Sequence, residues 1–136
     1  MDIKNIEETI DLSAESKVCA NDYSALSLAY IGDCVYELYV RSHLIKSGNR
    51  KVNELHKMAT GYVKAKAQAE FYRKIEGILT DEEQGAFHRG RNTKSHPPKN
   101  ADVIDYKIAT GVEALIGYLY INGDTKRISE LMEKLF

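Results

Sequence analysis

The stretch LAYIGDCVYELYV, residues 28–40, carries an aspartate at the centre of a mainly apolar run. A run of this kind predicts a helix in the protein core, but aspartate disfavours a helix interior and is costly to bury without a partner. On a helical wheel the neighbours of Asp33 are Leu26, Ala29, Glu37 and Val40. Asp33 thus lies on a mixed, largely apolar face, and the sequence predicts that it has a specific partner.

A second acid, Glu113, has the same surroundings in DVIDYKIATGVEALIGYLYI, residues 102–121. Its neighbours on the wheel are Tyr106, Ala109, Gly117 and Tyr120. If the two helices pack antiparallel, the two carboxylates can face each other, and they then repel unless one is protonated or a basic side chain or cation lies between them. Two converging carboxylates suit Mg²⁺ or Mn²⁺, and a water held by such an ion is a candidate nucleophile against a phosphodiester.

The same pattern fits a simpler interpretation, in which each acid is partly exposed or paired to a Lys, Arg or Tyr side chain. Gly32 and Gly117, each near an acid on its helix, favour a close approach of the two backbones. Ordinary helix packing explains these glycines equally well, so periodicity alone leaves both interpretations open.

The composition predicts a single all-α domain over residues 1–136, with residues 1–20 as an acidic N-terminal extension. The chain has only two prolines, and 43% of its residues are hydrophobic. Cys19 and Cys34 lack metal-knuckle spacing, which favours a reducing compartment. Because the N-terminus is acidic and no apolar run reaches the length of a membrane span, we expect a soluble, cytoplasmic protein.

Apolar periodicity and capping signals predict about five helices and no strand. The first begins at Asp22 or Ser24 and ends near Lys46. The others are expected at residues 52–79, with a bend near Gly61, from the capping box TDEE at 80–83 to about RGRN at 89–92, at 102–121 and at 126–135. Two prolines make residues 92–100 a loop. The last helix has the core stripe Ile128, Leu131, Met132 and Leu135.

The net charge of −1 conceals a separation of charge along the chain. Residues 1–16 contain five acids against Lys4, so the remainder carries +3. The positive charge gathers in two clusters, one of Lys57, Lys64, Lys66, Arg73 and Lys74, the other of Arg89, Arg91, Lys94 and Lys99 within the acid-free residues 84–101. Such clusters can attract a polyanion, although a solvated charged loop is the alternative.

Five segments stand out as motifs: LAYIGDCVYELYV, GVEALIGYLYINGD, AKAQAE, RGRNTKS and PKNADV. Together they resemble the catalytic domain of the ribonuclease III family, an all-helical dimer that cuts double-stranded RNA with divalent metal. The size, and the absence of a C-terminal double-stranded-RNA-binding domain, narrow the resemblance to Mini-ribonuclease III. It extends over residues 23–119.

The resemblance implies that Asp33 and Glu113 are the catalytic residues and the metal ligands, with Mg²⁺ as cofactor and Mn²⁺ as a substitute. It also implies that Tyr30 reaches into the other subunit of a homodimer. Ala29 and Thr110 stand where full-length ribonuclease III enzymes have further acids, and both departures are typical of Mini-ribonuclease III. They leave the number of metal ions open. Glu37 is either an outer group of the site or part of a surface ion pair.

The expected activity is hydrolysis of double-stranded RNA to 5′-phosphate and 3′-hydroxyl ends, in the maturation of the large-subunit (23S) ribosomal RNA precursor during ribosome biogenesis. No histidine is required as a base, since His43 and His56 are expected to be packing or surface residues. The expected RNA contacts are Arg89, Arg91, Lys94, Lys99 and Asn100 in a loop, with Lys64 and Lys66 beside the site. The alternatives are a non-catalytic double-stranded-RNA-binding protein on the same fold and a helical nucleotide pyrophosphohydrolase, although the ExxE pairs of the latter are missing from the two helices.

Overall fold

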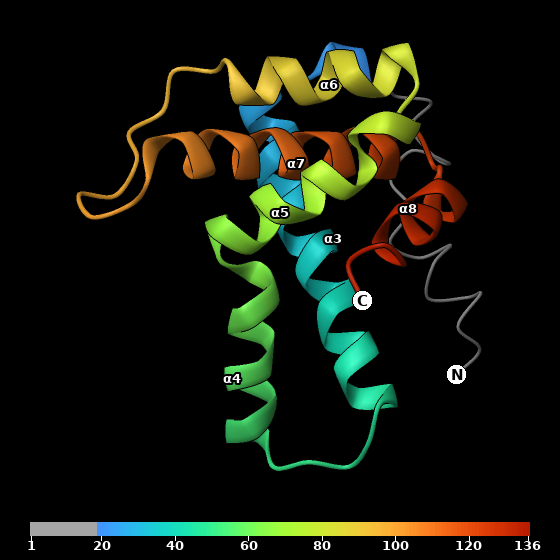
Figure 1. The fold of residues 1–136 in the computed structure, drawn as a ribbon. Helices are drawn as coiled ribbons and strands as arrows, with labels where there is room; N and C mark the ends of the chain where they lie inside the picture. Colours follow the sequence, from blue (N-terminus) through green and yellow to red (C-terminus); the bar gives the residue numbers. More distant parts are fainter. Residues whose placement is uncertain (1–18) are drawn as a thin grey trace.

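The structure, a computed structural model, describes residues 19–136, and these residues form helices without any strand (Figure 1). The predicted all-α class is confirmed. The elements are η1 (Ala20–Asp22), α3 (Ala25–Lys46), α4 (Val52–Val63), α5 (Ala65–Ile75), η2 (Glu76–Ile78), α6 (Asp81–Arg91), α7 (Val103–Ile121) and α8 (Thr125–Met132). Most of the predicted acidic extension, residues 1–20, lies outside the described residues.

Side-chain caps lie at the starts of four of these helices, among them α8, where the Asp124 side chain accepts a hydrogen bond from the backbone N–H of Arg127. The Ser24 hydroxyl accepts a hydrogen bond from the backbone N–H of Ser27 at the start of α3. Thr80 and Glu83 form the predicted capping box of α6. The side chain of Asp102 caps α7. Short polar side chains thus mark where these helices begin, and the sequence predicted this for Thr80 and, as one of two candidates, for Ser24.

Two helix boundaries differ from the sequence prediction. The expected bend near Gly61 is wrong, because the chain is interrupted at Lys64, whose backbone is extended with φ −64° and ψ 154°. Glycine permits a bend but does not impose one, and Gly61 stays within α4. The last helix ends at Met132 instead of residue 135, since Lys134 and Leu135 donate to carbonyls three residues back. Leu135 is still buried, as the predicted core stripe requires.

Helix α7 is the centre of the fold and packs against α3, α6 and α5 (Figure 1). Its residues 109–112, 114–117 and 119 are buried. Glycines allow the close crossings: a Cβ at Gly32 of α3 would overlap the carbonyl of Glu113, and one at Gly90 of α6 would overlap Ala114. The core therefore depends on backbone contact as well as on interlocking apolar side chains.

One ion pair joins α8 to α6. Arg127 donates two hydrogen bonds to the Glu83 carboxylate, with Nε–Oε2 2.9 Å and Nη2–Oε1 3.0 Å, and a third to the carbonyl of Ile78 at 2.7 Å. The Glu83 side chain is 5% exposed. A forked pair of this kind fixes orientation as well as distance, so it holds α8 in place.

None of the helices among the described residues is both long and apolar enough to cross a membrane.

Candidate active site

The crossing of α3 and α7 brings Asp33 and Glu113 together. Gly32 lies against the carbonyl of Glu113, and Gly117 lies against the carbonyl of Leu28. The contacting positions run in opposite directions along the two helices, as the sequence analysis required for the acids to face each other. The Asp33 carboxyl lies close enough to that of Glu113 to raise the pKa of Glu113. The two acids that the sequence selected are therefore direct neighbours.

The pair does not share burial equally. Glu113 is half-buried, whereas Asp33 is exposed and does not lie on a covered apolar face as its helical wheel suggested. Burial raises the pKa of Glu113 to about 8, and the neighbouring Asp33 carboxyl acts in the same direction. Near neutral pH the pair without a cation therefore retains a proton, so it is a place where positive charge is stabilised.

At the crossing of α3 and α7, the described residues offer two carboxylates and few other groups that could bind a metal ion. Ala29 packs in a small apolar cluster with Ala20, Leu28 and Ala114. The Thr110 hydroxyl donates to the carbonyl of Tyr106 at 3.0 Å. Within residues 19–136 no three His, Cys, Asp or Glu side chains group closely enough to hold a metal ion. Two hard carboxylate oxygens fit an ion such as Mg²⁺, which commonly keeps several waters.

Glu37, one turn after Asp33, belongs to a surface ion pair. Its Oε1 lies 2.8 Å from Nη2 of Arg41, in an i,i+4 arrangement on α3. This is the second of the two roles that the sequence analysis allowed.

The residues expected to bind RNA are exposed and lie on three parts of the chain. Arg89 and Arg91 are in the last turn of α6, and Lys94, Lys99 and Asn100 are in the connection to α7. Figure 1 shows this connection projecting from the end of the fold opposite α8. Lys64 lies at the α4–α5 break and Lys66 in the first turn of α5. Of these side chains, Arg89 has a described partner, Oδ1 of Asn21 at 3.4 Å.

Tyr30 is the most exposed large apolar side chain among the described residues, at 84%. It lies on α3 one turn before Asp33. The two histidines of the first helices are at the surface. His43 stacks on Phe136, with ring centroids 3.7 Å apart, and His56 is exposed on α4. Both histidines thus have the packing or surface positions expected of them.

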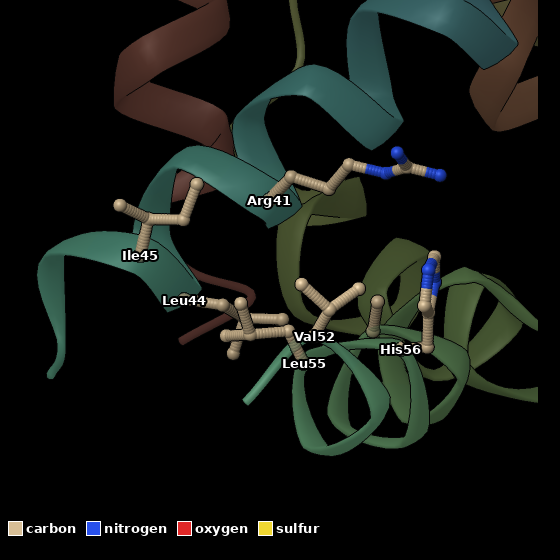
Figure 2. A pocket seen from close by; sticks show the side chains of 7 residues that line it. Arg41, Leu44, Ile45, Val52, Leu55 and His56 are labelled. Carbon is tan, nitrogen blue, oxygen red and sulfur yellow. The ribbon is translucent and has the colours of Figure 1, made fainter. Parts of the chain in front are cut away.

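A hollow of about 150 Å³ lies away from the acid pair, between the end of α3 and the start of α4 (Figure 2). Its lining includes Arg41, Leu44, Ile45, Val52, Leu55 and His56. Most of its surface is aliphatic, and neither carboxylate of the pair contributes to it. Although Arg41 and His56 line it, the hollow has no carboxylate that could hold a divalent metal ion.

Sequence reasoning missed Tyr36, which is fully buried on α3 close to Glu113. Burial and the charge of Glu113 both raise the pKa of Tyr36 above its ordinary value. Its hydroxyl donates to the carbonyl of Tyr62 at 2.5 Å. The signal was its position three residues after Asp33, on the neighbouring side of the same helical turn.

Known proteins resemble this chain over most of its length. Residues 26–124 match the Ribonuclease III domain family. A Mini-ribonuclease 3 of Desulfitobacterium hafniense is 48% identical over 114 residues, covering 84% of this chain and 73% of the relative. Another, of Brevibacillus brevis, is 50% identical over 112 residues, covering 82% and 84%. A crystal structure of a Fusobacterium nucleatum protein superposes with a TM-score of 0.75 at 34% identity, covering 82% of this chain and 90% of that one.

Proposed function

The chain belongs to the ribonuclease III family, in its Mini-ribonuclease 3 branch, and we propose that it is a magnesium-dependent endonuclease of double-stranded RNA that uses Asp33 and Glu113. Membership of the family makes it an endoribonuclease acting on RNA. The observation that carries the finer proposal is the pair of neighbouring acids at the crossing of two glycine-packed helices.

The chemistry of the pair supports this role. Both donors are carboxylates, and the raised pKa of Glu113 marks a position where a cation replaces a proton. Asp33 and Glu113 would hold Mg²⁺, which when bound would supply Lewis acidity at a phosphodiester oxygen and make a water more acidic, in keeping with hydrolysis to 5′-phosphate ends. Asp33, being exposed, faces the solvent side from which RNA approaches. Glu113 is held from the core side by α7.

The basic residues supply the affinity for RNA in this proposal. Double-stranded RNA is recognised mainly through phosphates and 2′-hydroxyls, which separated cationic side chains can meet without reading bases. The connection between α6 and α7 projects from the fold and carries exposed cations, as a phosphate-binding loop requires. Lys64 and Lys66, exposed at the break between α4 and α5, provide a second contact.

We propose a homodimer in which Tyr30 lies at the interface, so that two acid pairs act on opposite strands of one duplex. An 84% exposed tyrosine on a core helix supports this arrangement, because it leaves a large ring without cover within the described part of one subunit. Tyr30→Asp should shift the protein from dimer to monomer in sedimentation equilibrium. Ile45→Asp, which changes an exposed side chain at the far end of α3, is the control. A monomeric wild type would refute the dimer.

The substrate that we propose in the cell is the precursor of large-subunit (23S) ribosomal RNA, in the cytoplasm. This follows from the family resemblance of the motifs around both acids. Mapping the 23S rRNA ends in cells with and without the protein tests it, and unchanged ends would contradict it.

The cleavage reaction is tested with a long double-stranded RNA, Mg²⁺ and three variants. Asp33→Asn and Glu113→Gln preserve shape but remove a charge, and each should lower the cleavage rate by roughly a hundredfold or more, the scale of losing several kcal/mol of stabilisation. Glu37→Gln removes a carboxylate from the same helix as Asp33 and should retain most of the activity, since Glu37 is paired to Arg41.

Two results would overturn the nuclease mechanism. One is unchanged cleavage by Asp33→Asn, which would place the chemistry elsewhere. The other is RNA binding by the wild type without any cleavage in Mg²⁺ or Mn²⁺, which would identify a non-catalytic RNA-binding protein on this fold.

A further inference from the structure

The break between α4 and α5 is held by two buried side chains. Helix α4 ends at Val63 and α5 begins at Ala65, with Lys64 extended between them. A break of this kind deprives the last carbonyls of a helix of their usual partners. Here the Tyr36 hydroxyl donates to the carbonyl of Tyr62 at 2.5 Å, and Nε2 of Gln68 donates to the carbonyl of Val63 at 2.9 Å. We call residues 62–66 the corner.

Both donors are anchored in the core. Tyr36 is fully buried and Gln68 is 4% exposed. The ring of Tyr36 packs against Phe71 of α5, with centroids 6.1 Å apart. The amide oxygen of Gln68 is buried without a partner among the described residues. Turning the amide over would place that oxygen against the carbonyl of Val63, so the bond through Nε2 fixes the orientation of Gln68. The corner therefore has a single defined geometry.

The same tyrosine links the corner to the acid pair. Tyr36 is one turn after Asp33 on α3 and lies close enough to Glu113 for that carboxyl to raise the pKa of the Tyr36 hydroxyl, in addition to the larger effect of burial. Tyr36 thus interacts both with Glu113 and with the backbone two residues before Lys64. Lys64 and Lys66, on the outer side of the corner, are both exposed.

We propose that Tyr36 and Gln68 are positioning residues that hold Lys64 and Lys66 at a fixed place relative to Asp33 and Glu113, so that the corner binds the RNA backbone beside the bond to be cut. This inference rests on the proposed function. Two lysines on a flexible link would bind phosphate without a fixed register. On a corner capped from the core, they align the duplex with the acids.

The test uses Tyr36→Phe, which keeps the ring and removes the hydroxyl. Its affinity for a double-stranded RNA, measured by anisotropy without divalent cation across a range of salt, should fall about three- to tenfold, with a salt slope reduced by roughly one ion. Gln68→Met removes the other cap at similar volume and should act in the same direction. Tyr39→Phe is the matched control, because its hydroxyl lies on the same helix but contacts Ser129 and the carbonyl of Thr125.

A double-mutant cycle separates positioning from simple destabilisation. If Tyr36 acts through the lysines, Tyr36→Phe should cost no further affinity in a Lys64→Ala, Lys66→Ala background. Additive losses, or an unchanged salt slope in folded Tyr36→Phe and Gln68→Met, would overturn the inference. If the wild type binds RNA but does not cut it, the nuclease proposal is refuted, but the double-mutant cycle can still be measured because it uses binding alone. Failure of the nuclease proposal and failure of this inference are therefore distinguishable.

Discussion

Gly32 of α3 lies so close to Glu113 of α7 that a Cβ at residue 32 would overlap the Glu113 carbonyl oxygen. The reciprocal contact is that of Gly117 with the carbonyl of Leu28. Each acid is therefore adjacent to, or in, a point of backbone contact between the helices. The separation of the two carboxyls is set by the closest approach of two rigid helices, which is more exact than a loop could provide.

Replacing Gly32 by alanine should force α3 and α7 apart. Overpacking a core typically costs about 1–3 kcal/mol, and a clash with backbone belongs at or above the upper end of that range. We expect Gly32→Ala to lower the melting temperature by roughly 10 °C or more, since each kcal/mol corresponds to about 4 °C for a domain of this size.

Gly61→Ala is the control for that substitution. Gly61 is also helical, but a Cβ there would meet nothing within 4 Å. We expect it to be neutral or to stabilise the protein by about 0.5–1 kcal/mol. Equal melting temperatures for the two variants would contradict the close approach.

Arg127→Ala should destabilise the attachment of α8. It leaves the carboxylate of Glu83, whose side chain is 5% exposed, without its forked partner. Removing one member of a buried pair costs about 3–5 kcal/mol, and we expect about 2–4 here because Arg127 itself is 22% exposed. Urea unfolding measures the loss. Lys126→Ala, at the neighbouring exposed position, should change stability by less than about 0.5 kcal/mol.

The acid pair should make the metal-free protein less stable as pH rises. The pKa of Glu113 is raised from 4.5 to about 8 in the folded protein, so between these values the folded state holds a proton that the unfolded chain releases. Its stabilising contribution is complete below pH 4.5 and is lost as pH rises through about 8. The slope from one such group is at most about 1.4 kcal/mol per pH unit.

Urea unfolding in chelator between pH 5 and 9 measures this slope, and Glu113→Gln should flatten it. The pKa of Glu83 cannot produce the same signal. Burial alone would raise it, but the hydrogen bonds from Arg127 and Thr80 bring it below its ordinary value, so its contribution is lost only as the solution becomes more acidic. Parallel curves for wild type and Glu113→Gln would refute the proton held by the pair.

The sequence was most informative where a local signal acts alone. Thr80 caps α6 as predicted, and Ser24, one of the two candidates, caps α3, because capping depends on a side chain and the next few amides. The proximity of Asp33 and Glu113 was one of two interpretations that the pattern left open, and the glycines that favoured it do form the close contact. The solvent exposure of the two acids was harder to predict. Periodicity describes one helix at a time, whereas the burial of Glu113 and the exposure of Asp33 depend on every element that packs around them.

The break at Lys64 shows why the remaining detail was not predictable. The local candidate was Gly61, but the structure is interrupted where Tyr36, 26 residues earlier in the chain, supplies a hydroxyl to the carbonyl of Tyr62. A contact between residues so far apart in the chain produces no periodic pattern in the sequence. Residues whose main role is to hold a neighbour's backbone are therefore missed by motif and pattern alike.

The projecting connection between α6 and α7 should supply part of the salt-dependent affinity for RNA. Arg91 and Lys94 are both exposed, so Arg91→Ala combined with Lys94→Ala should leave the melting temperature unchanged. The double variant should bind double-stranded RNA more weakly, whatever the RNA sequence. The dependence of its affinity on salt concentration should correspond to about two fewer released ions. Arg89 is kept in this experiment because its guanidinium also contacts Asn21.

The control removes two exposed lysines, Lys126 in α8 and Lys134 in the turn that follows it. An equal change of slope in both double variants would mean that RNA responds only to total charge, and an unchanged slope in Arg91→Ala, Lys94→Ala would mean that the connection does not touch phosphates.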